Sequence, residues 1–112
     1  MAADCLFCKI VAGDIPSTEV YSDDGAYAFA DTNPQAPTHV LVVPRAHYAD
    51  VTAVADDPAA AHALLAGVRG VATKLDLHDF RTVLNTGAGV GQTVFHVHAH
   101  VLAGRPMGWP PG

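Results

Sequence analysis

The segment 96–101, with the sequence HVHAHV, constrains the fold of this 112-residue chain more than any other segment. Histidines occupy alternate positions, and small apolar residues fill the gaps between them. Residues i, i+2 and i+4 of a β-strand share one face, so the pattern predicts a strand with His96, His98 and His100 in a row, ~7 Å apart. Val97, Ala99 and Val101 would point to the other face. We expect one face of this strand to be buried and the other to carry chemistry.

Two helices and about five strands are predicted along the chain, mostly joined by short turns. The helices cover residues 5–12 and a segment that begins at Asp57-Pro58, where an N-cap carboxylate precedes a proline at the first helical position. The second helix is expected to bury one stripe, formed by Leu64, Leu65, Val68, Val71, Ala72 and Leu75. The predicted strands cover residues 19–22, 26–30, 39–43, 80–85 and 94–102. This order favours one α+β domain over residues 1–112 with an antiparallel sheet.

Charge and hydropathy exclude several classes of partner. The net charge is −5 and the six Lys and Arg residues form no run, which argues against DNA or RNA as the main partner. No window approaches the ~20 apolar residues of a membrane span, and the N-terminus has no basic, apolar leader. We therefore expect a cytoplasmic protein with no membrane partner.

Two kinds of chemistry use three alternating histidines. One is a metal site built on His-x-His, and the other is a phosphate-transfer site with one neutral imidazole as nucleophile. A hydrolytic metal site usually adds a nearby carboxylate, and the sequence after Asp79 contains none. The segment NTGAGVGQT before the histidines has glycines at 87, 89 and 91, whose backbone N–H groups suit an anion. A dinucleotide-binding fingerprint is excluded because a predicted strand, not a helix, follows these glycines.

Several motifs resemble one known family. HVHAHVL matches the His-φ-His-φ-His-φ-φ signature (φ apolar) of the histidine triad (HIT) superfamily. DTNPQAPTHVLVVPRAH, NTGAGVGQTVFHVHAHVL and the ending GRPMGWPPG resemble its nucleotide-binding branch, the purine nucleoside phosphoramidases. The resemblance covers nearly the whole chain from Leu6 onward. It implies a HIT-like α+β fold, with a five-stranded antiparallel sheet and two helices, pairing into a ten-stranded sheet across a homodimer.

The resemblance also implies an activity and three catalytic residues. The expected enzyme cleaves purine nucleoside 5′-phosphoramidates, such as nucleotidyl-lysine, to a nucleoside monophosphate and an amine. His98 would attack the phosphorus through Nε2, so its Nδ1–H needs an acceptor, for which we expect a backbone carbonyl of the same strand. His100 would protonate the leaving amine and His39 would hold the array by hydrogen bonding. A dinucleoside polyphosphate hydrolase and a nucleotide-binding adaptor with incidental hydrolysis remain alternatives.

The substrate-binding residues are likewise implied by the resemblance. Asp31 would accept hydrogen bonds from both ribose hydroxyls, and Trp109 would reach the partner protomer's site. The base pocket would comprise Leu6, Phe7, Ile10, Phe29 and Thr32, and the phosphate grip Asn85, Gly91, Gln92 and Thr93. The branch commonly has Ser at the position of Thr93, His at Gly108 and Ile at Thr32, and these departures bear on rate, leaving group and base pocket.

A Cys-x-x-Cys pair, Cys5 and Cys8, is the remaining motif. Many bacterial relatives use such a pair with two histidines, which here correspond to His47 and His96, to bind structural zinc. Cys₂His₂ is a normal tetrahedral zinc set. The alternative is two reduced cysteines packed as small hydrophobic residues. No cofactor is expected to be required for catalysis.

Overall fold

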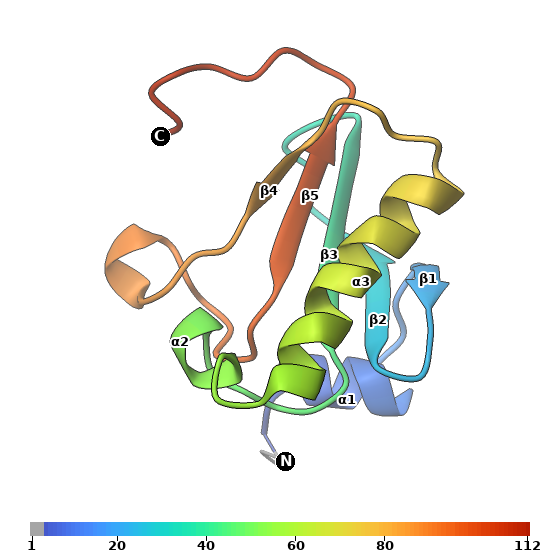
Figure 1. The fold of residues 1–112 in the computed structure, drawn as a ribbon, viewed down its shortest axis with the longest axis vertical. Helices are drawn as coiled ribbons and strands as arrows, with labels where there is room; N and C mark the ends of the chain where they lie inside the picture. Colours follow the sequence, from blue (N-terminus) through green and yellow to red (C-terminus); the bar gives the residue numbers. More distant parts are fainter. Residues whose placement is uncertain (1–3) are drawn as a thin grey trace.

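The computed structural model describes residues 4–112, which form one five-stranded antiparallel sheet with helices on both faces (Figure 1). The strands lie in the order β1-β2-β3-β5-β4, and every neighbouring pair is antiparallel. In chain order the elements are α1 (Leu6–Ala12), β1 (Glu19–Ser22), β2 (Ala26–Ala30), β3 (Thr38–Pro44), α2 (Val51–Val54), α3 (Pro58–Lys74), β4 (Arg81–Val83), a 3₁₀ turn (Ala88–Val90) and β5 (Ala99–Ala103). The predicted α+β fold with a five-stranded antiparallel sheet is confirmed.

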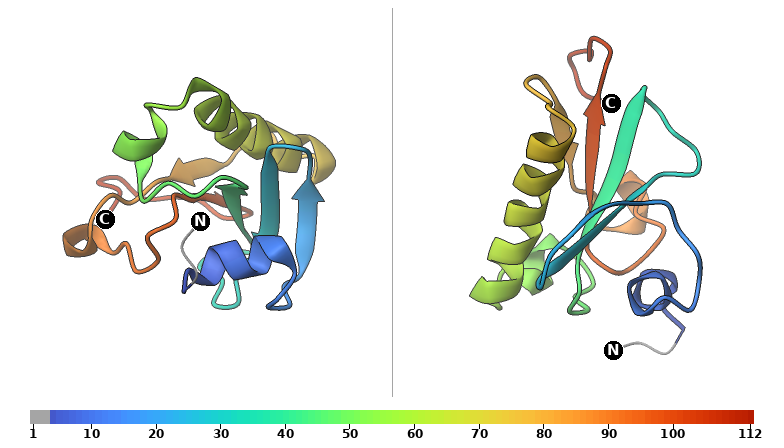
Figure 2. Two further views of the ribbon diagram at one scale, coloured as in Figure 1. Left: turned by 90° about the horizontal axis from the view of Figure 1, so that it is seen from below. Right: turned by 90° about the vertical axis from the view of Figure 1, so that its right-hand side faces the viewer.

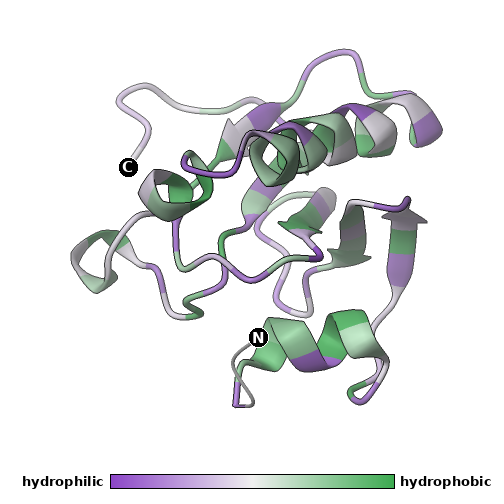
Figure 3. Ribbon diagram, turned by 60° about the horizontal axis from the view of Figure 1, so that its bottom comes forward, coloured by the Kyte–Doolittle hydropathy of each residue, from purple (hydrophilic) through white to green (hydrophobic). Residues whose placement is uncertain are grey.

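The sheet forms the middle of three layers, with α3 on one face and α1 on the other (Figure 2). Alternate residues of β3 serve the two sides. Val40 and Val42 belong to the cluster that packs under α3, whereas Leu41 and Val43 belong to the cluster that packs against α1. α1 is apolar over most of its length (Figure 3), as its position against the sheet requires.

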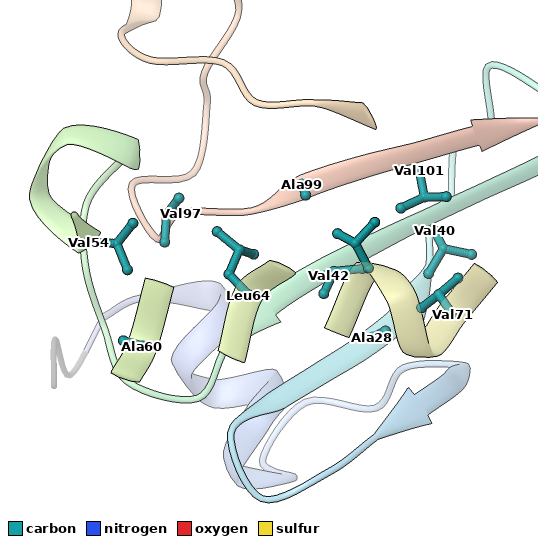
Figure 4. Packing of buried hydrophobic residues seen from close by; sticks show 11 residues of the cluster. Ala28, Val40, Val42, Val54, Ala60, Leu64, Val71, Val97, Ala99 and Val101 are labelled. Atoms are coloured by element: carbon teal, nitrogen blue, oxygen red, sulfur yellow. The ribbon is translucent and has the colours of Figure 1, made fainter. Parts of the chain in front are cut away.

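The larger core lies between α3 and the sheet (Figure 4). Val97, Ala99 and Val101 are buried in it, which confirms the apolar face predicted from the alternating pattern. α3 begins as predicted, with the Asp57 carboxylate capping the Ala60 N–H and Pro58 at the first position. Its buried residues are Ala60, Leu64, Gly67, Val68 and Val71.

The predicted stripe of α3 was partly wrong. Leu65 is 63% exposed and Leu75 is exposed at the helix C-cap. Gly67 takes the place of a larger residue in the stripe because the helix lies close to the sheet there: a Cβ at Gly67 would come within 2.7 Å of Val42 Cγ1. No helix in residues 4–112 is long and apolar enough to cross a membrane.

Two elements differ from prediction in the region that precedes the histidines. α2 was not expected: it is a single turn whose N-cap, Asp50, accepts hydrogen bonds from the Thr52 and Ala53 N–H groups. β5 is shorter than the predicted strand 94–102, so His96 and His98 precede its first residue, Ala99. The partner strand β3 ends at Pro44, and beyond it the Val97 N–H donates to the Tyr48 carbonyl of the following loop. The regular pairing of β3 with β5 therefore does not extend to His96 and His98.

Candidate functional site

The tautomer of His98 is set by the backbone beside it. Its Nδ1 lies 2.9 Å from the carbonyl oxygen of His96, which can only accept a hydrogen bond. Nδ1 therefore carries the proton and Nε2 presents a bare lone pair. The expected backbone acceptor is present two residues upstream, although it precedes the regular strand. The Phe7 ring contacts the His98 ring edge to face, with centroids 5.0 Å apart.

The tautomers of His39 and His100 follow from a second set of hydrogen bonds. The Gln35 N–H donates to His39 Nδ1 at 3.0 Å, so that nitrogen is bare and the His39 proton resides on Nε2. His39 Nε2 lies 2.9 Å from His100 Nδ1 and 3.3 Å from Asp31 Oδ2. His39 thus donates to His100 Nδ1, and His100 keeps its own proton on Nε2. Neighbouring rings, 5.0 Å apart, consequently offer a lone pair on His98 and an N–H on His100.

Burial favours the uncharged form of His98 and of His100. Desolvation is the main cause that lowers the pKa of His98 below 6.5, against a hydrogen bond to the His96 carbonyl that raises it. The pKa of His100 falls to about 4, first because of burial and then because His98 and His39 lie beside it. An uncharged imidazole with a free Nε2 is the form required of a nucleophile.

A pocket of about 650 Å³ opens on the face of the sheet that α1 covers, and His39, His98 and His100 are not among its lining residues. Two lining residues connect it to them: Phe7 contacts His98, and Asp31 faces His39. Seven of the predicted binding residues line it: Leu6, Phe7, Ile10, Phe29, Asp31, Thr32 and Thr93. Asp31 joins the pocket to the histidines, since Oδ1 accepts from the Asn33 N–H at 2.8 Å while Oδ2 faces His39. Each carboxylate oxygen accepts more than one hydrogen bond, so both retain capacity for a ligand.

The pocket lining also includes residues that the sequence did not single out. They are Ile15, Pro16, Ser17, Thr18, Ala30, Leu41 and Val94. Leu41 could have been predicted as a lining residue, because it lies two residues after His39 on a strand and so shares its face. The Ile15–Thr18 connection carries no such pattern.

The glycine-rich segment holds its own shape rather than presenting every donor outward. The Gln92 side chain, expected to grip phosphate, is 2% exposed and donates both amide hydrogens, to the Ala49 and Val94 carbonyls, while its oxygen accepts from the Gly87 N–H. The Gly91 N–H likewise donates to the Ala88 carbonyl. Gln92 therefore braces this loop against the chain after β3.

Two further predicted residues lie away from the pocket lining as the structure describes it. Asn85 is half-buried after the end of β4. Trp109 is 82% exposed on the C-terminal segment, which the Arg81 guanidinium holds through a 3.0 Å hydrogen bond to the Gly108 carbonyl.

Four metal-ligating side chains gather at the start of α1. The ligand atoms of Cys5, Cys8, His47 and His96 all lie within 4.8 Å of one another. Cys8 Sγ is 3.3 Å from His47 Nδ1 and 3.5 Å from His96 Nδ1, and the two Nδ1 atoms are 3.2 Å apart. Zinc bonds of usual length in a tetrahedron would set S···N edges of about 3.5 Å and N···N edges of about 3.3 Å.

The tautomer of His96 suits the same arrangement. Its Nε2 lies 2.8 Å from the Pro44 carbonyl and must donate to it, which leaves Nδ1 bare and turned towards the sulfurs. The donor set, its spacing and this tautomer all fit a tetrahedral metal site. A second group, formed by Asp31, His39 and His100, also brings three ligand atoms together. There the hydrogen bonds already described occupy both His39 nitrogens, so that group does not fit a metal.

A small α+β sheet that carries uncharged histidines of opposite tautomer beside an apolar pocket with a carboxylate defines a class of ligand-binding protein. Comparison with known sequences identifies the family. The HIT domain model matches residues 12–107, so the chain belongs to the HIT domain family.

Individual relatives cover the whole fold. An uncharacterized HIT-like protein of Synechocystis is 49% identical over 114 residues, covering all of both chains. A 14 kDa zinc-binding protein of Zea mays is 42% identical over 96% of this chain and 87% of its own. The crystal structure of a HIT family hydrolase from Legionella pneumophila superposes with a TM-score of 0.79 at 43% identity, over 97% of this chain and 100% of that one.

Proposed function

We propose that this protein is a hydrolase that cleaves the P–N bond of purine nucleoside 5′-phosphoramidates, such as nucleotidyl-lysine. The products are a nucleoside monophosphate and an amine. The observation that carries the proposal is the pair of neighbouring rings, His98 with a bare Nε2 and His100 with an Nε2–H. The likeness to a protein described as a HIT family hydrolase supports it.

In the first step, His98 Nε2 attacks the phosphorus and the bond from phosphorus to nitrogen breaks. The leaving nitrogen takes the proton of His100 Nε2, and the negative charge that this leaves on the His100 ring is balanced by the positive charge that forms on the His98 ring. The His98 ring becomes positively charged when phosphorylated, and the His96 carbonyl that accepts its Nδ1–H stabilises that charge. The same charge, 5.0 Å from the His100 ring, favours the loss of the His100 proton.

In the second step, water attacks the phosphorus of the nucleotidyl-histidine intermediate. Its proton returns to His100, and the bond from phosphorus to His98 Nε2 breaks. Both rings then regain their starting tautomers, because the Gln35 N–H and the His96 carbonyl still dictate which nitrogen is bare.

The pocket supplies substrate binding. Phe7, Ile10 and Phe29 offer apolar contact to a flat purine, which discriminates weakly between bases. We place the ribose hydroxyls at Asp31 and a phosphate oxygen at the Thr93 hydroxyl, with Asn85 and Gly91 near the same phosphate. Thr32 and Ser17 add hydroxyl groups to a lining that is otherwise largely apolar.

The Cys5, Cys8, His47 and His96 cluster is proposed to hold a structural zinc ion. Four protein ligands complete a tetrahedron and leave no open position, so the zinc would crosslink α1 to the segments that carry His47 and His96 rather than act on substrate. The zinc-binding relative from Zea mays supports this assignment.

Metal analysis tests the zinc proposal. We expect about one zinc per wild-type chain and near zero in Cys8→Ser after zinc-supplemented expression. Chelation should lower the Tm by about 5 °C or more and raise amide exchange in α1 while α3 stays protected. Wild-type protein with no bound zinc would overturn the proposal.

We also propose a cytoplasmic homodimer. Cys5 and Cys8 lie together in the proposed zinc cluster, where they would act as thiolate ligands, as suits a reducing compartment. β4 is an edge strand, and exposed Trp109 lies one residue from the carbonyl that Arg81 of β4 holds. Two sheets joined along β4 would place Trp109 against the partner protomer.

Turnover of an adenosine 5′-phosphoramidate with a fluorescent amine tests the activity. Wild type should exceed His98→Ala by at least about 10³-fold, because the substitution removes the nucleophile. His78→Ala, at an exposed histidine that pairs with Asp76, serves as the matched control and should keep the wild-type rate. Wild type no faster than His98→Ala would refute the proposal, and faster cleavage of a diadenosine polyphosphate would reassign the substrate.

A further inference from the structure

Arg105 lies in the C-terminal segment and is exposed, yet it contacts the loop whose backbone hydrogen-bonds to His39. Its Nε donates to the Gln35 carbonyl at 3.0 Å, and its side chain also donates to the Pro106 carbonyl at 3.0 Å. Gln35 lies 70 residues away in the sequence. Its other backbone group, the N–H, is the donor to His39 Nδ1. One short stretch of backbone is thus held by Arg105 at its carbonyl and bonded to the site through its amide.

The approach of the C-terminal segment to this loop is close and specific. Gly104, just before Arg105, has a φ of 97°, and a Cβ there would come within 2.9 Å of Pro37. Only glycine combines this left-handed conformation with such close contact. On the loop itself, the Gln35 side chain donates to the Asn33 carbonyl and the Asn33 N–H donates to Asp31. Hydrogen bonds therefore hold the loop at Asp31, where it begins, and at His39, where it ends.

Removing the Arg105 contact would change which ring nitrogens of His39 and His100 carry hydrogen, rather than how the pocket binds substrate. The Gln35 N–H keeps His39 Nδ1 bare, and Asp31 Oδ2, 3.3 Å from Nε2, also favours the proton on Nε2. Without a well-placed Gln35 N–H, only Asp31 opposes the other tautomer, so a fraction of His39 takes the proton on Nδ1 and leaves Nε2 bare. The 2.9 Å contact between His39 Nε2 and His100 Nδ1 then requires His100 to donate from Nδ1, which leaves its Nε2 without a proton. His98 would be unchanged, because the His96 carbonyl sets its tautomer independently.

We propose that Arg105 is a positioning residue for the reaction: by holding the Gln35 carbonyl it keeps the N–H of the same residue on His39 Nδ1, and so favours the His39 tautomer that leaves His100 with an Nε2–H for the leaving group. The proposal rests on the proposed function only for its effect on turnover. The tautomers of His39 and His100 can be observed without any substrate.

The experiment compares Arg105→Met with Arg105→Lys and with Arg81→Met, in the full-length protein. Arg81→Met removes a different guanidinium contact to the same C-terminal segment, at the Gly108 carbonyl, and so serves as the matched control. Correlation spectra of ¹⁵N-histidine-labelled protein identify which ring nitrogen of each histidine carries hydrogen. Wild type and Arg81→Met should show His39 and His100 protonated at Nε2, and Arg105→Met should add the other tautomer at both rings while His98 stays at Nδ1.

Kinetics provide the second readout. Arg105→Met should lower kcat about tenfold with KM within about twofold of wild type, because the pocket is untouched, and Arg105→Lys should recover part of kcat. Unchanged His39 and His100 spectra in Arg105→Met would overturn the proposal. So would a mixed tautomer in Arg81→Met, which would assign the effect to the segment in general. If wild type lacks turnover, the proposed function fails while the spectra still decide the role of Arg105.

Discussion

Asp31 stands where the pocket meets the histidines, and its two oxygens have different neighbours. Oδ1 caps the Asn33 N–H and Oδ2 faces His39 Nε2. The ribose hydroxyls of a nucleotide are the groups we assign to its remaining acceptor positions.

A substitution at Asp31 tests that assignment. Asp31→Asn should raise KM for a ribonucleoside phosphoramidate by about tenfold, since hydrogen bonds to a charged acceptor are worth about 1.5–3 kcal/mol. The same substitution should have a much smaller effect on the 2′-deoxy substrate, which has one hydroxyl fewer. Equal losses for both substrates would mean that Asp31 acts through His39 instead.

His100 gives a prediction for stability against pH. Its pKa is about 4 in the folded protein against 6.5 for an unperturbed histidine. Between these values the unfolded chain binds a proton that the folded site excludes, so the free energy of unfolding falls as the pH drops from 6.5 towards 4 and is unaffected by this group above 6.5. Urea unfolding at pH 7.5 and 5.5 should show a smaller acid loss in His100→Asn than in wild type. An equal loss in the two proteins would contradict the assignment.

Single residues also show where sequence reasoning succeeds. The alternating pattern of segment 96–101 predicted that the side chains of His98 and Ala99 point to opposite faces. The prediction holds outside the regular strand because the extended chain before β5 has the same two-residue period. The task of Gln92 could not be predicted, since the carbonyl of Ala49 that it holds is 43 residues away and belongs to an irregular loop. Arg105 was missed for the same reason: its partner Gln35 is identified only by the tertiary fold.

At the scale of elements, α3 depends on a close approach to the sheet at Gly67. A Cβ there would meet Val42 Cγ1 at 2.7 Å and Ala26 Cβ at 2.9 Å. Gly67→Ala should therefore destabilise the protein by about 1–3 kcal/mol in urea unfolding, although alanine is the better helix former.

Gly89→Ala is the control for that substitution. No atom of residues 4–112, apart from those next to it in the chain, lies within 4 Å of a Cβ at Gly89, so the effect of the substitution should stay within about 0.5 kcal/mol. A stabilised Gly67→Ala would show that α3 moves away from the sheet at little cost.

Elements with strong local signals were predicted, and weak ones were not. α1 and α3 have clear ends, at Gly13 with a φ of 84° and at the Asp57 cap. α2 is one turn, too short for an apolar period to reveal it. The stripe of α3 failed at Leu65 because it lies next to Leu64, at the margin of the buried face, where depth of burial depends on what packs opposite.

At the scale of the whole molecule, the homodimer proposed along the edge of β4 predicts a molecular mass that can be measured. Light scattering should give twice the chain mass of 11.6 kDa at micromolar concentration. Trp109→Ala should shift the equilibrium towards monomer by removing a large apolar contact, as aromatic anchors do at interfaces. A wild-type mass of one chain at all concentrations would refute the homodimer.

β3 has no side that faces water: residues 39–44 are all buried, one face under α3 and the other behind the pocket. A change on the first face alters the core under α3, and a change on the second alters the cluster that packs against α1, from which Leu41 also lines the pocket. We therefore expect few substitutions in β3 to be neutral. A saturation mutagenesis map would show six consecutive intolerant positions there, whereas β1, with Glu19 and Ser22 exposed at its ends, would accept many replacements.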